Sequence, residues 1–485
     1  MSRLIPLPIV LPLLGAAVSI LVGRSRTAQR VISLTVLAAN LAIAVALLVE
    51  VDREGTLATT AGGWDAPMGI TLVADRLAAI MLAVSTLMLL AVLVYAIGQP
   101  GAERDHVGFQ SVYLVLTAGV SGAFLTGDLF NLFVSFEMML TASYVLLTIG
   151  GRRDQVRAGM TYVVISLLAS ALFVTALALI YGATGTVNMA DLAGKIADLP
   201  AGIRSGFAVL LVVVFGIKAA LFPLFSWLPD SYPTAPSPVA AIFAGILTKV
   251  GVYAIIRTQT LLFPGDSRPA TLLLWLAGLT MVVGILGAIA QDSVKRILSF
   301  NIVSHIGYMV MGLALFTPAG LAAAILYAVH HIVAKTTLFL NAGLIEHAGG
   351  SGRLPQLGGM VRSAPVVAVL FLVPALALAG IPPLSGFLPK FALVDAGLAA
   401  DQPLIVAVSL VVSLLTIFSL VKIWSGVFWN PADDPPELQP YDTGRLGGPA
   451  MMVVPTAVLL VVGVAIAVAG SPLYELSERA AVDLL

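Results

Sequence analysis

Apolar stretches of about 20 residues follow one another along almost the whole chain, and they constrain its fold more strongly than any other feature. A membrane-crossing helix needs roughly 20 mainly apolar residues, because each residue adds about 1.5 Å and the hydrocarbon core is about 30 Å thick. The chain is 59% hydrophobic and 10% charged, with a mean hydropathy of +1.03, which is outside the range of a soluble domain. We therefore predict an all-α polytopic membrane protein with fourteen transmembrane helices, near residues 4–22, 30–49, 70–97, 109–126, 128–149, 158–182, 205–224, 237–260, 271–290, 297–316, 319–345, 364–399, 404–429 and 450–469.

Prolines are expected to break two of these helices, the seventh and the twelfth. The twelfth stretch is too long for one straight crossing and contains Pro382, Pro383 and Pro389, while Pro223 lies at the end of the seventh. Proline lacks a backbone N–H and cannot continue an ordinary helix. The longest polar stretches, 50–69, 183–204 and 430–448, have the length of interhelical loops, so we predict a single transmembrane domain over residues 1–485.

The chain also repeats itself. PLFSWLPD at 223–230 matches PLSGFLPK at 383–390, and the SFE segment at 135–137 matches SFN at 299–301, at separations of 160 and 164 residues. The two nearly equal offsets predict two five-helix repeats, helices 4–8 (109–260) and helices 9–13 (271–429), between flanking helices in 1–97 and 450–485. Because five is odd, the second repeat would be inverted, the architecture in which ion sites lie near the midplane on discontinuous helices. A chance likeness between two proline-rich breaks is the alternative.

Charged side chains inside the predicted spans mark the candidate functional site. A lysine at the centre of a spanning helix costs about 2.5–3.5 kcal/mol on insertion scales, yet five of the seven lysines lie within spans: Lys218, Lys249, Lys335, Lys390 and Lys422. Lys422 is near enough to a helix end to reach the surface. Glu137 is the only glutamate deep in a span and lies at a depth comparable to Lys218, so the two side chains could pair.

One acid cannot neutralise four buried amines, so we expect some of the lysines to exchange protons. A static ion pair that fixes helix packing is the competing interpretation for Glu137 and Lys218.

The histidines add a second kind of proton carrier. His331 and Lys335 are four residues apart and share a helix face, which suits a proton relay. His330, on a different face, is more typical of a satisfied core residue, and His305 fits either interpretation. A haem between these histidines is disfavoured because His330 and His331 are adjacent and splay apart. The chain has no cysteine, which excludes iron–sulfur clusters and thiol chemistry, and we predict no metal site and no cofactor.

Loop charges predict the orientation. With fourteen spans both termini lie on one side, and cytoplasmic loops carry an excess of lysine and arginine. The side opposite the termini has twelve such residues against seven, so we expect a cell-membrane protein with both termini outside the cytoplasm. The twelve are Arg24, Arg26, Arg30, Arg104, Arg152, Arg153, Arg157, Lys295, Arg296, Arg353, Arg362 and Arg445; the seven are Arg3, Arg53, Lys195, Arg204, Arg257, Arg268 and Arg479. The net charge of zero argues against nucleic acid as a partner.

Three motifs carry a resemblance to a known family. PLFSWLPDSYPTAPSPVAAIFAGILTKVGVYA, the SFEMML segment around Glu137, and HHIVAKTTLFLNAGL are similar to the proton-translocating antiporter-like subunits shared by respiratory complex I and the Mrp-type multisubunit Na+/H+ antiporters. The resemblance covers nearly the whole chain and implies a fourteen-helix core with inverted repeats. It also implies a driving pair at Glu137 and Lys218, with a relay through Lys249, His331 with Lys335, and Lys390.

Within this family, TKVGVYA and the lysine at position 390 are most similar to the D-type subunits of Mrp antiporters. The resemblance then implies an ion-translocating subunit, not an enzyme, that works with membrane subunits of the A, B, C, E, F and G types and exchanges protons for a monovalent cation. An M- or N-type proton-pumping subunit of NADH–quinone oxidoreductase (complex I), or a related membrane hydrogenase subunit, is the alternative. A scaffold subunit that only anchors active partners is a third interpretation.

Overall fold

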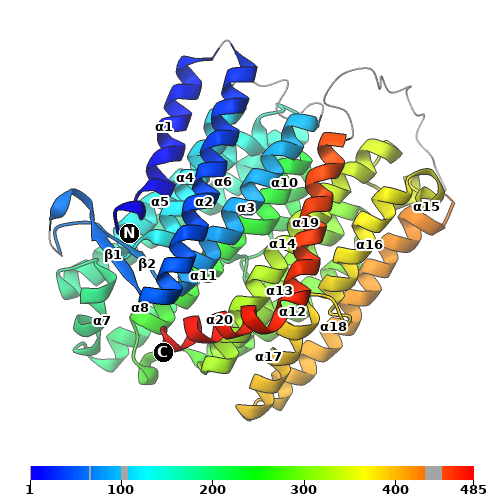
Figure 1. The fold of residues 1–485 in the computed structure, drawn as a ribbon. Coiled ribbons are helices and arrows are strands. Elements are labelled where there is room, and N and C mark those ends of the chain that lie inside the picture. Colours follow the sequence, from blue (N-terminus) through cyan, green and yellow to red (C-terminus); the bar gives the residue numbers. More distant parts are fainter. Residues whose placement is uncertain (1, 24, 65–66, 100–107, 432–449) are drawn as a thin grey trace.

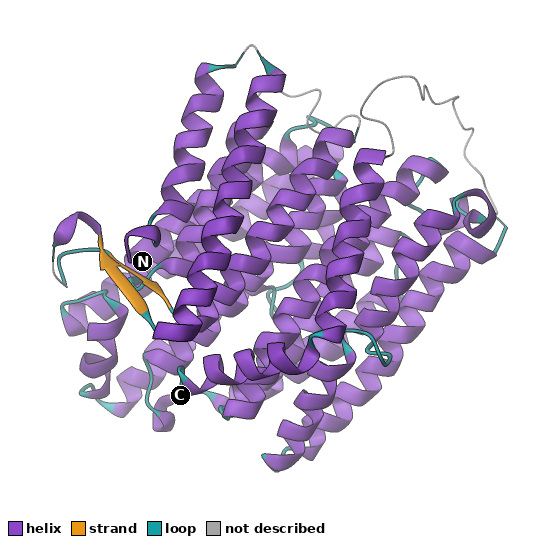
Figure 2. Cartoon of the chain, viewed as in Figure 1, coloured by secondary structure: helices purple, strands orange, loops and turns teal. Residues whose placement is uncertain are grey.

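Long helices packed side by side make up nearly all of the protein (Figures 1 and 2). The computed structural model describes residues 2–23, 25–64, 67–99, 108–431 and 450–485. In this part of the chain, twelve helices are long and apolar enough to cross a membrane, and α4 (Phe109–Leu125) and α16 (Pro365–Ala379) are shorter apolar helices. Apart from α4 and α16, the helices, which include those that form the twelve long apolar segments, are α1 (Leu7–Leu21), α2 (Arg26–Glu54), α3 (Arg76–Gly98), α5 (Leu129–Thr148), α6 (Arg153–Thr184), α7 (Met189–Ala197), α8 (Ala201–Ala219), α9 (Trp227–Ser231), α10 (Ser237–Ile242), α11 (Thr248–Leu261), α12 (Ala270–Ile289), α13 (Val294–Ala314), α14 (Pro318–Gly349), α15 (Met360–Ser363), α17 (Phe387–Ala399), α18 (Pro403–Trp424), α19 (Ala450–Val468) and α20 (Gly470–Val482).

Two of the three predicted loops contain regular structure, and most of the third lies outside the described residues. Residues 50–69 include β1 (Leu57–Thr60), which pairs antiparallel with β2 (Thr71–Ala74) in the register Leu57 to Ala74. The 183–204 stretch includes the amphipathic helix α7, whose buried residues Met189, Leu192 and Ile196 recur at helical spacing. The 430–448 loop lies outside the described residues from position 432 onward, as do Arg24, Arg104 and Arg445.

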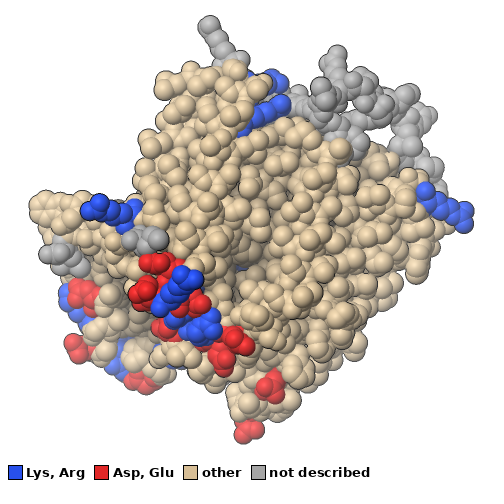
Figure 3. Space-filling view, viewed as in Figure 1, with Lys and Arg blue, Asp and Glu red and all other residues tan. Residues whose placement is uncertain are grey.

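The interior and the perimeter of the bundle differ in burial. The apolar segments of α14 and of the run from Ser237 to Leu261 are completely buried, whereas those of α2 and α19 are each only 28% buried. Peripheral helices therefore present apolar side chains outward, as expected for contact with lipid. On the face drawn in Figure 3, the charged residues gather at the two ends and the band between them lacks charge.

Both predicted helix breaks occur. α8 ends at Ala219, Ala220 has a positive φ of 61°, and Pro223 lies in the turns before α9. α16 ends at Ala379, and Pro383 lies in the turns before α17. Pro389 is the third residue of α17, where it is tolerated because first-turn N–H groups have no partner within the helix.

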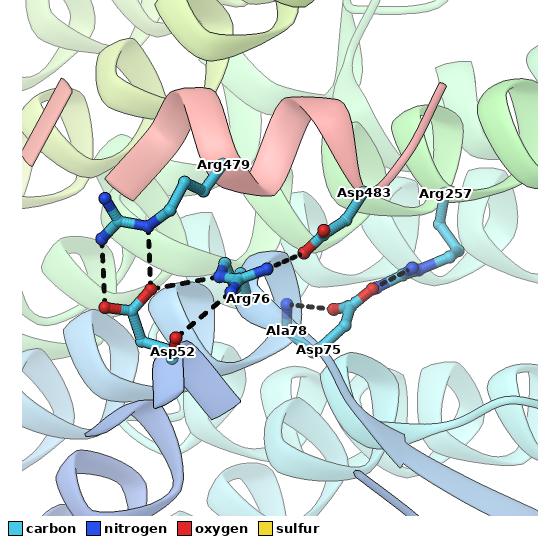
Figure 4. Close-up of polar contacts among 7 residues, drawn as sticks. All are labelled: Asp52, Asp75, Arg76, Ala78, Arg257, Arg479 and Asp483. Carbon is cyan, nitrogen blue, oxygen red and sulfur yellow. Dashed lines mark hydrogen bonds and ion pairs between the residues drawn. The ribbon is translucent and has the colours of Figure 1, made fainter. Parts of the chain in front are cut away.

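The C-terminal helix α20 lies across the ends of the long helices and packs against α14 and α3 (Figure 1). Arg479 of α20 and Asp483, the residue that follows the helix, hold it there. Arg479 donates to both carboxylate oxygens of Asp52, each at 3.0 Å, and Asp483 accepts from Arg76 at 2.6 Å (Figure 4). The C-terminus is thus tied to α2 and α3 by ion pairs.

Two residues counted as loop charges from the sequence are buried in helices. Arg257 lies in α11 and pairs with Asp75 (Figure 4), while Lys295 lies in α13 and pairs with Glu346 of α14. Both assignments to loops were wrong. Arg257 falls inside the predicted stretch 237–260 and stays in the helix, whereas Lys295 is helical because α13 begins before the predicted stretch at 297. A buried charge that is paired does not need to reach a loop.

Candidate functional site

The central helices α11, α13 and α14 enclose the basic residues that the sequence singled out. Lys249, His305, His331 and Lys335 are each 0% exposed, so this part of the bundle buries several ionisable groups together. Such groups are rare inside membrane proteins and mark ion or proton pathways when they occur.

Glu137 and Lys218 lie close in the fold but are not in contact. Glu137, on α5, accepts a hydrogen bond from Ser170 of α6. Lys218 is in the last turn of α8, with its Nζ 6.0 Å from the centre of the Phe136 ring. No nitrogen–oxygen contact of 4.0 Å or less joins the two side chains, so in this conformation the glutamate is held by a hydroxyl instead of the lysine.

A small cavity of about 30 Å³ lies beside Lys218, and Tyr162, Ser166 and Trp227 contribute to its lining. This volume is sufficient for a water molecule, since a water needs roughly 10–15 Å³ of such space and two or more polar partners. Ser166 is one helical turn before Ser170 on α6, and the Ser170 hydroxyl also donates to the Ser166 carbonyl at 3.0 Å. Ser166 thus lines the cavity beside Lys218, and its neighbour Ser170 contacts Glu137.

Lys249 follows directly on a change in helix geometry. Phe243–Leu247 form a π-helix between α10 and α11, and the Lys249 Nζ donates to the carbonyl oxygen of Ala244 at 2.5 Å. A π-helical turn widens the helix and displaces its backbone carbonyls, a feature frequent at functional sites. The lysine thus has a backbone acceptor and no carboxylate partner among the described residues.

His331 and Lys335 share a face of α14, as the sequence predicted. Lys335 donates to the Leu298 carbonyl of α13 at 3.2 Å. Neither ring nitrogen of His331 has a hydrogen-bond partner within the described ranges of the chain. A buried polar group without a hydrogen-bond partner costs about 1–3 kcal/mol. The His331 imidazole is therefore available to bind a transient hydrogen-bond partner.

A continuous line of rings leads from His331 to Lys390. The centroids of His331 and His305 are 5.1 Å apart, and the Nδ1 of His305 lies 2.5 Å from the Tyr327 hydroxyl. Tyr327 stacks on Tyr308 at 5.3 Å, and the Lys390 Nζ lies 5.4 Å from the Tyr308 ring centre. His305, for which the sequence left two interpretations, therefore lies inside the central line.

Lys390 lies at the second helix break. Its Nζ donates to the carbonyl of Ala379, the last residue of α16, and to the Ser413 hydroxyl, both at 2.9 Å. The last carbonyls of a helix have no partner within it, so the break supplies the acceptor. His330 lies nearby but points to the break itself, with its Nδ1 2.9 Å from the Ser385 hydroxyl.

Sequence reasoning missed the hydroxyl groups of this line. Tyr327 is four residues before His331, a spacing that places both on one helix face, and this signal was present in the sequence. Ser170 and Ser413 gave no such signal, because serine is common in membrane helices and its role here depends on the neighbouring helix.

The family described as "NADH:quinone oxidoreductase/Mrp antiporter, TM" matches residues 126–416. The chain belongs to this family. Across its full length it is 44% identical to the D-type subunit of the Na(+)/H(+) antiporter of Alkalihalophilus pseudofirmus, of which it covers 98%. It is 39% identical to the D-type Na(+)/H(+) antiporter subunit of Bacillus subtilis, with 90% of this chain and 89% of that protein aligned.

Two solved structures have the same fold over the whole chain. A chain of the Mrp complex from Dietzia sp. DQ12-45-1b superposes with a TM-score of 0.92 and 36% identity, covering 100% of this chain and 98% of that one. A chain of the membrane-bound sulfane sulfur reductase, an archaeal respiratory membrane complex, gives a TM-score of 0.88 at 27% identity with the same coverage. Chains with this fold thus occur in an Mrp complex and in an archaeal respiratory membrane complex.

Proposed function

We propose that this chain is the D-type subunit of a multisubunit Mrp-type Na+/H+ antiporter and moves protons along its central line of buried basic and hydroxyl groups. One observation carries the proposal: the contacts from His331 through His305, Tyr327 and Tyr308 to Lys390 are continuous within the bundle. The 44% identity to a D-type antiporter subunit and the 0.92 TM-score to a chain of an Mrp complex support the assembly.

The proposed transfer starts at Glu137 and Lys218. Glu137 exchanges its Ser170 partner for Lys218, which changes the charge that Lys249 experiences. Two amines about 7 Å apart at an effective dielectric near 20 repel by roughly 2.4 kcal/mol, enough to displace a proton from the second amine. The proton then passes by Lys335 and His331 to Lys390. This subunit is an ion-translocating component and not an enzyme.

The architecture we propose has fourteen crossings. Besides the twelve long apolar helices, α4 and the pair α16 and α17 would each complete one crossing. The similar breaks after Ala219 and Ala379 support two inverted five-helix repeats over 109–260 and 271–429, with 1–97 and 450–485 as flanking helices. We place the chain in the cell membrane with both termini outside the cytoplasm, and we expect A-, B-, C-, E-, F- and G-type subunits as partners.

The second candidate is a proton-pumping subunit of complex I or a related membrane hydrogenase. The family description names NADH:quinone oxidoreductase, and the archaeal respiratory complex supplies a structural neighbour. NADH-linked quinone reduction by the purified complex would favour this candidate, whereas cation-driven proton exchange without an electron donor favours the antiporter.

The proposal is tested by Lys218→Ala and Glu137→Ala in the fully assembled complex. Sodium-driven dissipation of a pH gradient is measured in everted membrane vesicles, and assembly is checked by copurification of the other subunits. Both variants should assemble and lose exchange. Lys195→Ala is the matched control, because this lysine is an exposed residue of α7 paired with Asp191. Normal exchange in both test variants would refute the function.

A further inference from the structure

A polar hollow of about 600 Å³ lies where α14 ends and α13 begins, away from the central line. Its wall includes Arg152, Gln155 and Ser237, and its least exposed charged residues are Lys295 and Glu346. The side chain of Arg152 is 62% exposed, so the wall reaches the protein surface. The hollow is far larger than the space of about 30 Å³ that one water occupies in the liquid.

An ion pair forms the floor of this hollow. The Nζ of Lys295 lies 2.7 Å from Oε2 of Glu346, and the Ser237 hydroxyl donates to the same oxygen at 3.3 Å. The lysine side chain is 7% exposed, whereas that of the glutamate is 33% exposed. The carboxylate therefore faces the hollow, and the amine lies behind it in the protein.

The ion pair of Lys295 and Glu346 is connected to the central line of buried groups through α13. Lys295 is three residues before Leu298, whose carbonyl accepts from Lys335, and three residues of helix span about 4.5 Å. The same two helices, α13 and α14, thus carry both contacts. Nearly one turn before Glu346 on α14, a Cβ at Gly343 would clash with the Tyr95 hydroxyl and the Ser237 side chain, so the absence of a side chain at Gly343 lets both groups approach the helix.

We propose that Glu346 is the proton-loading site between this hollow and the central line. The step rests on the proposed function. The Glu346 carboxylate takes a proton from a hydronium ion in the hollow and releases water, which removes its charge and frees Lys295. The proton then leaves along the hydroxyl groups and water toward Lys335, and the ion pair with Lys295 forms again. Arg152 is the other charged residue that lines the hollow in the described part of the chain.

The first experiment replaces the proton carrier. Glu346→Gln keeps the shape and hydrogen bonding but cannot ionise, so sodium-driven exchange should fall about a hundredfold or more, the lower range for loss of a proton-transfer group. Glu346→Asp should retain much of the exchange. Asp154→Asn is the matched control, since this carboxylate is 59% exposed and pairs with the rim residue Arg152. Normal exchange in an assembled Glu346→Gln variant overturns the proposal.

The second experiment leaves Glu346 intact and so remains informative if its variants fail to assemble. The chain has no cysteine, so Ser351→Cys at the wall of the hollow provides a single thiol. A membrane-impermeant thiol reagent should label it in the assembled complex, and labelling should block exchange. Absence of labelling, or labelling without effect, overturns the proposal.

Lys218→Ala, assayed in parallel, separates the two levels. If exchange survives both Lys218→Ala and Glu137→Ala, the proposed function fails. If Lys218→Ala abolishes exchange and Glu346→Gln does not, only the loading site fails.

Discussion

The ion pair between Asp75 and Arg257 offers the sharpest test of how the bundle positions its central lysines (Figure 4). Arg257 donates to both carboxylate oxygens of Asp75, at 2.5 and 2.7 Å, and the two side chains are only 10% and 9% exposed. Asp75 also accepts from the Ala78 backbone N–H at 2.8 Å and so caps α3. Because Arg257 is about two turns beyond Lys249 on α11, the pair fixes the helix that carries this lysine.

The expected loss in the free energy of unfolding follows from the burial of the ion pair between Asp75 and Arg257. Asp75→Asn leaves the guanidinium of Arg257 buried without a counter-charge, and breaking a buried pair in this way destabilises a protein by about 3–5 kcal/mol. The cap itself survives, since asparagine caps helices as well as aspartate. Asp75→Ala should cost about 1 kcal/mol more because the cap is also lost. Arg257→Met should destabilise in turn, by leaving the carboxylate unpaired.

The double variant decides between an ion pair and two independent effects. Asp75→Asn with Arg257→Met removes both charges, so it should be more stable than the sum of the single variants by about 2–3 kcal/mol. The free energy of unfolding is measured by denaturant titration in mixed micelles, with the fluorescence of the five tryptophans as the signal. Asp191→Asn breaks only a surface ion pair with Lys195 and should change the free energy of unfolding by less than about 1 kcal/mol. A loss below about 1 kcal/mol for Asp75→Asn, or strict additivity, would refute the reasoning.

Three further outcomes are expected. Burial opposes ionisation of the Asp75 carboxyl, but the charge and hydrogen bonds of Arg257 outweigh this effect and hold the pKa of Asp75 below its usual 3.8. The stability from this group is therefore complete above pH 3.8 and lost only as the pH falls through the lower folded pKa, so unfolding titrations should show a constant Asp75→Asn deficit between about pH 5 and 8. Gly251→Ala would bring a Cβ within 2.6 Å of the Ala219 backbone nitrogen, and forcing α11 from the end of α8 should cost about 1–3 kcal/mol in the same titration and reduce exchange; an unchanged variant would contradict the close approach. Ser170→Ala removes the hydroxyl that donates to Glu137. Since a hydrogen bond to a charged group is worth about 1.5–3 kcal/mol, the rate of sodium-driven exchange in vesicles should change roughly tenfold. Copurification of the other subunits should stay normal.

Features that depend on short stretches of chain could be predicted from the sequence. The breaks after Ala219 and Ala379 were predictable because proline acts on its own backbone and on that of its immediate neighbours. Lys249 and Lys335 could be recognised as buried because each lies within an apolar run long enough to cross a membrane. The end of α14 could not be placed in the same way. Apolar composition stops at residue 345, but the helix continues to Gly349 and includes Glu346.

The sequence by itself determined the class of fold, the positions of the helix breaks and the set of buried basic residues, because apolar length, proline and charge act locally. Only the tertiary structure decided which groups meet. It placed Ser170 against Glu137, Tyr327 against His305 and Lys295 against Glu346. Each of these contacts joins two helices, and helical periodicity states which residues share a face but not which neighbour that face meets. The rotation and approach of the packed helices supply that information.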